Sequence, residues 1–237
     1  MKNANNLCDI FLDKLKYITI TGSLILLMFL WSIIPTIILK MLNINIDSLP
    51  QTIKVLFSFI FDIAFLILLM YIYKKELNLE FKKFFNKKNC FKNIKTSLFY
   101  WSLGLAIMIT FNLIISSITS SLAANETAVR EMIDKVPIYM AFQVMIYAPI
   151  SEEIIFRKSI DRIFKNKYLY VLVSGLIFGG LHVIYSITSP IDLLYLLPYC
   201  SLGFTFALLY KDTNNIFSTI TAHSIHNTLA FLLYLLY

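Results

Sequence analysis

The feature that most constrains this chain is a series of long apolar stretches with almost no charge. Each is long enough to cross the roughly 30 Å hydrocarbon core of a bilayer as a helix. An apolar fraction of 58% and a charged fraction of 15% leave too little polar surface to cover a soluble globule. No period-two strand pattern is present, so the sequence predicts an all-α, polytopic transmembrane helix bundle. The seven expected spans are Ile18–Leu39, Val55–Tyr73, Leu98–Leu122, Ile138–Ile160, Tyr168–Ile187, Ile191–Tyr210 and Ile216–Tyr237.

A segment before the first span, residues 5–17, places apolar and charged residues at helical spacing. This pattern is typical of an amphipathic helix on the membrane surface or of an extension of the first span. Basic residues define the orientation, because cytoplasmic loops carry an excess of Lys and Arg. Alternate loops assigned to the cytoplasm hold 17 of the 21 basic residues, and the others are Lys40, Lys54, Arg130 and Lys135. We therefore expect a cytoplasmic N-terminus, and the lysine-rich composition favours a bacterial plasma membrane.

The loop between the second and third spans is strongly basic, with eight lysines from Lys74 to Lys95. Phenylalanines interleave with lysines over 78–96, which is typical of an amphipathic stretch on the inner leaflet or of a solvated loop. The formal charge of +7 is concentrated beside apolar spans, so the expected partner is the lipid bilayer and no nucleic acid. We expect N-terminal helices and this cytoplasmic loop over residues 1–94, then a catalytic helix bundle over 95–237, in one membrane domain.

Polar residues at membrane depth are informative, because a charged side chain there costs roughly 2.5–3.5 kcal/mol on insertion scales. The second span holds Asp62, but most such residues lie in the C-terminal half. In the fourth span Glu153 and Arg157 are four apart and share a helix face, so we expect them to pair. Glu152 points about 100° away, which leaves one carboxylate free. The alternative is an ordinary charged helix end.

The fifth span combines an aromatic residue, a histidine and two glycines. Phe178 and His182 are four apart and share one helix face. Gly179 and Gly180 permit close approach by a neighbouring helix. Taken alone, this histidine is explained more readily by packing than by catalysis.

The seventh span carries His223 and Asn227 on one face, with His226 about 60° away from it. An amide in hydrocarbon needs partners, so Asn227 is expected to face protein or water. Counted at 1.5 Å per residue, the polar residues of the three spans lie roughly 11–21 Å from the cytoplasmic boundary. These overlapping depths predict a polar cavity that admits water, although interhelical hydrogen bonding would explain each residue alone.

Three motifs follow one another on separate expected spans: Glu152-Glu153-x-x-x-Arg157, Phe178-x-x-x-His182 and His223-x-x-x-Asn227. They resemble the EExxxR, FxxxH and HxxxN motifs of the CPBP family of intramembrane proteases, also called the Abi family. That family includes CAAX prenyl endopeptidases and bacteriocin-processing or immunity proteins. The resemblance covers about residues 95–237, whereas residues 1–94 carry no diagnostic motif.

The resemblance implies an endopeptidase whose peptide or protein substrate enters from the membrane or from the cytoplasmic side. It implies that Glu152 and His182 activate a water, and that His223 and Asn227 stabilise the oxyanion. The second glutamate and the arginine of the first motif would support the first glutamate. Activated water and oxyanion donors together suffice for peptide hydrolysis. The implied catalytic residues are therefore Glu152, Glu153, Arg157, His182, His223 and Asn227.

Metal dependence and two other functions stay open on the sequence alone. Glu152, His182 and His223 match a two-histidine, one-carboxylate donor set for Zn²⁺, yet the chain has no HExxH motif. We favour a glutamate-based mechanism without a cofactor, with Zn²⁺ as the alternative. The chain could instead be a non-catalytic membrane scaffold or bacteriocin self-immunity protein, or a small transporter that relays protons. No inverted repeat supports the transporter.

Overall fold

The computed structural model describes residues 2–120, 122–184, 187 and 189–236, with side chains from residue 11 onward. Parts of the expected third and fifth spans, and the expected end of the last span at Tyr237, lie outside these residues. All regular elements in the described part are helical, as the sequence predicts. They are α1 (Lys2–Trp31), α2 (Ile34–Met41), α3 (Gln51–Ile72), α4 (Lys74–Phe84), α5 (Cys90–Ser116), α6 (Ala124–Lys135), α7 (Pro137–Phe142), η1 (Gln143–Tyr147), α8 (Ala148–Glu153), η2 (Ile154–Ser159), α9 (Lys167–Val183), η4 (Pro190–Tyr195), α10 (Leu196–Thr213) and α11 (Ile216–Leu236).

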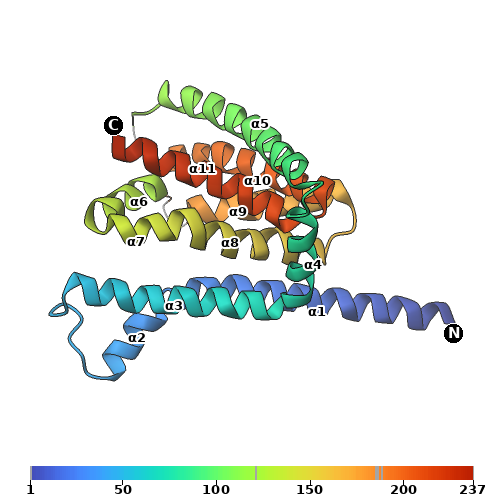
Figure 1. Cartoon of the computed structure of the whole chain (residues 1–237), viewed down its shortest axis with the longest axis horizontal. Coiled ribbons are helices and arrows are strands. Elements are labelled where there is room, and N and C mark those ends of the chain that lie inside the picture. The colour runs from blue at the N-terminus through green and yellow to red at the C-terminus, as the bar shows by residue number, and fades with distance from the viewer. Residues whose placement is uncertain (1, 121, 185–186, 188, 237) are drawn as a thin grey trace.

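The longer helices run roughly along one direction and form a bundle (Figure 1). α1 and α3 lie side by side beneath the C-terminal helices, and α4 crosses one end of the bundle. The N-terminus, α4 and the start of α5 lie at this end, which carries most of the lysines. The helices α2 and α6 and the end of α11 lie at the opposite end.

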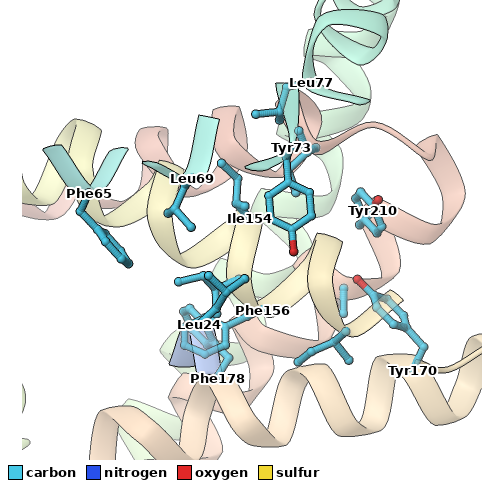
Figure 2. Close-up of a cluster of buried hydrophobic side chains, with 14 residues drawn as sticks. Leu24, Phe65, Leu69, Tyr73, Leu77, Ile154, Phe156, Tyr170, Phe178 and Tyr210 are labelled. Atoms are coloured by element: carbon cyan, nitrogen blue, oxygen red, sulfur yellow. The ribbon is translucent and has the colours of Figure 1, made fainter. Parts of the chain in front are cut away.

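An apolar cluster joins the two N-terminal helices to the rest of the bundle (Figure 2). Leu24 of α1 and Phe65 and Leu69 of α3 belong to it, together with Phe156 of η2 and Phe178 of α9. Phe65 and Leu69 are completely buried. Close packing of this kind holds helices together where lipid surrounds them. The N-terminal helices therefore support the segment that carries the charged motif.

Within the described residues, four helical segments are long and apolar enough to cross a membrane: Phe11–Trp31, Gln51–Ile72, Cys90–Ser116 and Pro190–Thr213. Only 11%, 17% and 11% of the apolar windows of the first three are buried, against 61% of the fourth. The helices α1, α3 and α5 thus present apolar side chains outward, and α10 lies inside the bundle. The other three expected spans are not shown by this measure. α9 has 17 residues, the fourth expected span is divided among short helical elements, and His223, His226 and Asn227 lower the mean hydropathy of α11.

The first expected span, Ile18–Leu39, is wrong at its C-terminal end. α1 stops at Trp31, and Pro35 is the second residue of a separate helix, α2, where its missing N–H is not needed. The indole of Trp31 donates a hydrogen bond to the carbonyl of Phe61 at 2.7 Å, which ties the end of α1 to α3. Residues 5–17 extend α1, which is one of the two expected arrangements.

The basic segment 78–96 forms the second half of α4, a short turn and the start of α5. One face of α4, with Glu80 and Phe84, is buried, whereas its lysines are exposed. The Glu80 carboxylate pairs with Lys158 of η2 and accepts the backbone N–H of Ile216 at 2.7 Å. α4 is thus an amphipathic helix whose buried face packs on the protein at the start of α11.

The helices α9 and α10 approach each other closely at Gly179. A Cβ added there would lie 2.8 Å from the backbone nitrogen of Cys200, a clash that side-chain adjustment cannot relieve. A Cβ at Gly180 would meet nothing within 4 Å. The expectation that both glycines permit close helix approach is therefore right for Gly179 and wrong for Gly180.

Candidate active site

The two glutamates lie on a helical segment that is widened at two places. The segment runs from Pro137 to Ser159 and contains the π-helical turns η1 and η2 on either side of α8. Pro149, which has no N–H, is the second residue of α8 and directly follows the first widened turn. Such turns occur often at functional sites, because they redirect side chains within a helix. Here they flank Glu152 and Glu153.

Glu153 and Arg157 form an ion pair inside the protein, as their spacing predicts. Arg157 Nε lies 2.9 Å from Glu153 Oε2, and both side chains have no exposed surface. The guanidinium also donates to Ser174 Oγ of α9 at 2.8 Å and lies over the ring of Phe178, 4.8 Å from its centroid. Buried charges require such partners, since an unpaired one is strongly destabilising.

The second oxygen of Glu153 contacts a histidine rather than the neighbouring glutamate. His223 Nδ1 lies 3.0 Å from Glu153 Oε1. Because the arginine keeps this carboxylate ionised, Nδ1 carries the proton and donates it to the bond. The Glu153–Arg157 pair therefore orients His223 of α11, which differs from the sequence expectation that the pair supports Glu152.

Glu152 and His182 face each other across a short gap. His182 Nε2 lies 3.9 Å from Glu152 Oε2, and about a fifth of each side chain is exposed. His182 Nδ1 donates to the carbonyl of Phe178 at 2.8 Å, since a carbonyl can only accept. In the neutral ring Nε2 is then an acceptor that faces a carboxylate. Two acceptors at this separation suit a group that donates one hydrogen to each, such as water.

Aromatic rings hold the His182 imidazole in this orientation. Tyr199 of α10 stacks on it with a centroid distance of 4.9 Å and an angle of 25° between the ring planes. Phe178 lies on α9 with its centroid 4.5 Å from the imidazole. The Tyr199 hydroxyl in turn accepts a hydrogen bond from Asn125 of α6 at 3.2 Å. The ring is thus fixed by packing and by its bond to the backbone.

Asn227 lies one helical turn beyond His223 on α11. Its side-chain amide donates one hydrogen to the carbonyl of Val144 in η1 at 2.8 Å. An amide nitrogen has two hydrogens, so one remains for another acceptor. The widened turn η1 and α11 are therefore joined directly at the candidate site.

A cavity of about 230 Å³ lies among these side chains. It extends from Glu152 and His182 to α6 and to Tyr234 near the end of α11. His226 also lines it, with a buried Nδ1 that has no hydrogen-bond partner within the residues that the structure describes. The three motifs thus meet at one cavity, as their depths predict. The six candidate residues divide into four that line it, Glu152, His182, His223 and Asn227, and two behind it, Glu153 and Arg157.

Sequence reasoning missed the contributions of Tyr199 and α6 to this site. Tyr199 belongs to an apolar run with no motif, so nothing in the sequence marks its stacking on His182. α6 lies between two expected spans and lines the cavity with residues that include Glu126 and Arg130, an ion pair at 2.9 Å. Its amphipathic pattern, with charges beside Val129 and Ile133, was the available signal.

The donor set proposed for Zn²⁺ does not fit this arrangement. No group of three His, Cys, Asp or Glu side chains in the described part of the chain is placed to hold a metal ion. Nδ1 of His223 is bonded to Glu153 and Nδ1 of His182 to a carbonyl, so each ring could offer only its Nε2 to a metal. We therefore derive no catalytic step through a metal.

Comparison with known proteins points to one family. Residues 134–229 match the family model described as "Type II CAAX prenyl endopeptidase Rce1-like". Over 107 residues the chain is 40% identical to the Bacillus subtilis (strain 168) protein named "Putative membrane peptidase YdiL", covering 44% of this chain and 40% of that protein. Over 149 residues it is 28% identical to "UPF0177 protein YxdF" of Lactococcus lactis subsp. lactis (strain IL1403), covering 58% of this chain and 77% of that protein. No solved structure matches.

The region matched by the family model contains the candidate site. The family model covers the segment that runs from the end of α6 into α11 and includes all six candidate residues. The chain spans 40% of the length of the Bacillus relative and 77% of the Lactococcus relative.

Proposed function

Because residues 134–229 belong to the Rce1-like type II CAAX prenyl endopeptidase family, a family of membrane peptidases, we propose that the chain is an intramembrane endopeptidase. It hydrolyses a peptide bond in a membrane-associated peptide or protein. The observation that carries this proposal is the convergence of Glu152, His182, His223 and Asn227 on one cavity inside an apolar helix bundle.

Glu152 and His182 together activate the attacking water. The water donates one hydrogen to the Glu152 carboxylate and the other to His182 Nε2, the two acceptors that are 3.9 Å apart. Glu152 takes the proton as the water oxygen attacks the scissile carbonyl carbon, and later gives it to the leaving amine as the C–N bond breaks. Protons and electrons balance without a further reactant.

His223 and Asn227 stabilise the oxyanion of the tetrahedral intermediate. Asn227 uses the amide hydrogen that is not bonded to Val144. His223 donates from Nε2 when it carries a second proton, and the Glu153 carboxylate stabilises that imidazolium through its bond to Nδ1. Each oxyanion donor of this kind contributes a rate factor of about 10²–10³.

The same proposal includes the placement of the chain in the membrane. α9, α11 and the segment from α7 to η2 lie alongside α5 and α10 and cross the bilayer with them, which gives seven spans. The N-terminus and the lysine-rich end face the cytoplasm of a bacterial cell, because most basic residues gather there. The cavity extends toward α6 at the opposite end, so the substrate reaches it from the membrane or from that end rather than past the basic loop.

Cleavage of a peptide library tests this function. The purified protein is reconstituted in vesicles and incubated with peptides from a digest of bacterial proteins, and new termini are identified by mass spectrometry. We expect defined cleavage sites with the wild type and a loss of at least about 10² in rate with Glu152→Gln, which retains the size of the side chain. Glu131→Gln, on the exposed side of α6, is the matched control and retains full activity.

The outcome also separates the protease from a non-catalytic scaffold or a self-immunity protein. A scaffold tolerates Glu152→Gln and yields no new termini with either protein. Full cleavage by a well-inserted Glu152→Gln protein would show that this glutamate is not the base.

A further inference from the structure

One ionisable residue in the membrane has no part in the mechanism above. Asp62 lies near the middle of α3, roughly 15 Å from either end of the helix at 1.5 Å per residue. A carboxylate at this depth is costly and marks a functional position unless it only joins two helices. α3 belongs to the N-terminal part of the chain, which lies outside the matched family region.

The Asp62 carboxylate is held by two donors from the segment that carries the glutamates. Its Oδ2 accepts the hydroxyl of Tyr139 at 2.7 Å and the side-chain amide of Gln143 at 2.5 Å. The side-chain nitrogen of Gln143 also donates to the hydroxyl oxygen of Tyr139 at 2.7 Å, which closes a three-residue network. All three side chains are half-buried, so the network lies between α3 and the helical segment.

This network is one residue away from the hydrogen bond that orients Asn227. Gln143 is the first residue of η1, and the next residue, Val144, supplies the carbonyl that accepts from Asn227 at 2.8 Å. A π-helical turn replaces i→i+4 bonds by longer ones and needs outside support to persist. Asp62 supplies that support on the side of the turn opposite to α11.

We propose that Asp62 is a positioning residue that fixes η1 through Gln143 and thereby aims the amide of Asn227 at the oxyanion. This role rests on the proposed peptidase function. It gives α3, and with it the N-terminal half of the chain, a defined part in catalysis. The chemistry at Asp62 itself is limited to accepting two hydrogen bonds.

A purely structural role for Asp62 makes a different prediction. Phe59 of α3 already packs edge-on against Phe142, with ring centroids 4.7 Å apart, and so joins the same two segments. If Asp62 only joined helices, its loss would act like the loss of that packing. Stability would fall, but the Asp62 change would leave the kcat per folded molecule unaltered, both with Asn227 present and in the Asn227→Ala background.

A double-mutant cycle with Asn227 separates these roles. The kcat and KM of Asp62→Leu, Asn227→Ala and the double variant are measured on the library peptide that the wild type cleaves fastest. Misplacing a catalytic group by about 1 Å costs up to about 10² in rate, so we expect Asp62→Leu to lower kcat about tenfold with KM nearly unchanged. In the Asn227→Ala background the same change has no further effect on kcat, because the group that Asp62 positions is absent.

Two further variants act as an independent test and a matched control. Gln143→Ala removes the link between Asp62 and η1 and lowers kcat as much as Asp62→Leu does. The double variant of Gln143→Ala and Asp62→Leu has no lower kcat than either single variant. Asp62→Asn retains one acceptor oxygen, so its kcat lies between those of Asp62→Leu and the wild type. This variant replaces Asp62→Leu in the cycle if Asp62→Leu does not fold. Phe59→Leu weakens the neighbouring packing and lowers the melting temperature, but leaves kcat within about twofold.

The positioning role would be overturned if the kcat losses of Asp62→Leu and Asn227→Ala multiplied in the double variant. It would also be overturned if folded Asp62→Leu and Asp62→Asn kept the wild-type kcat. Those results leave the proposed function intact as long as Glu152→Gln remains inactive. Activity in Glu152→Gln would instead refute the proposed function and, with it, the role of Asp62.

Discussion

Two adjacent glutamates provide a matched pair for testing how the site divides stability from chemistry. Glu153 and Glu152 lie side by side at the end of α8, so replacement by alanine removes the same atoms from neighbouring positions. Glu153 is completely buried and bonds Arg157 and His223. Glu152 faces the cavity, and its Oε2 is buried with no hydrogen-bond partner among the described residues.

The expected magnitudes follow from these contacts. Glu153→Ala leaves a buried guanidinium without its carboxylate, which costs about 3–5 kcal/mol, although Arg157 keeps its bond to Ser174. At about 2–4 °C per kcal/mol for a chain of this size, the melting temperature falls by about 6–20 °C. Glu152→Ala removes the oxygen Oε2, which accepts no hydrogen bond from the described residues, so its effect on the free energy of unfolding stays within about 1 kcal/mol.

Thermal unfolding of the two variants in one detergent measures this difference. Replacing both Glu153 and Arg157 by apolar residues of similar size restores much of the melting temperature, because no unpaired charge is left. It does not restore peptide cleavage, since His223 then lacks its carboxylate. A melting temperature that falls as far with Glu152→Ala as with Glu153→Ala would refute the assigned roles.

Two other predictions concern the packing of α9 and the orientation of the chain. Gly179→Ala lowers the melting temperature, because the added Cβ meets the backbone of Cys200. Gly180→Ala leaves the melting temperature unchanged or raises it by a few degrees, since its Cβ meets nothing. A Gly179→Ala protein as stable as Gly180→Ala would contradict the close approach of α9 and α10. Single cysteines are introduced into a variant that lacks the native ones. The thiol of Lys87→Cys reacts with a membrane-impermeant reagent only from the cytoplasmic side, whereas the thiol of Glu131→Cys reacts in intact cells. The reverse labelling pattern would overturn the orientation.

Local spacing explains which parts of the site could be predicted from the sequence. Glu153 and Arg157 are four apart on one helix, so their pairing follows from helix geometry alone. The meeting of the three motifs at one cavity follows from their similar depths, because helices in a membrane share a common direction. Both predictions use only distances along a helix.

Contacts between helices explain what could not be predicted. The bond from His223 to Glu153 joins residues 70 positions apart and depends on how α11 packs against α8. The stacking of Tyr199 on His182 depends in the same way on the approach of α9 and α10. Asp62 was visible as a charge within a span, but its partners on α7 and η1 were not. Helix periodicity also did not reveal which of two adjacent glycines faces a neighbour.

The central claim is that Glu152 and His182 act together on one water, and a second double-mutant cycle tests it directly. The kcat of Glu152→Gln, His182→Gln and the double variant is compared with that of the wild type on the same library peptide, per molecule of folded protein. If the two side chains activate one water, each single change lowers kcat by at least about 10², and the double change is no slower than the slower single variant. Losses that multiply, or a His182→Gln protein that retains the wild-type kcat, would contradict a shared water between these two residues.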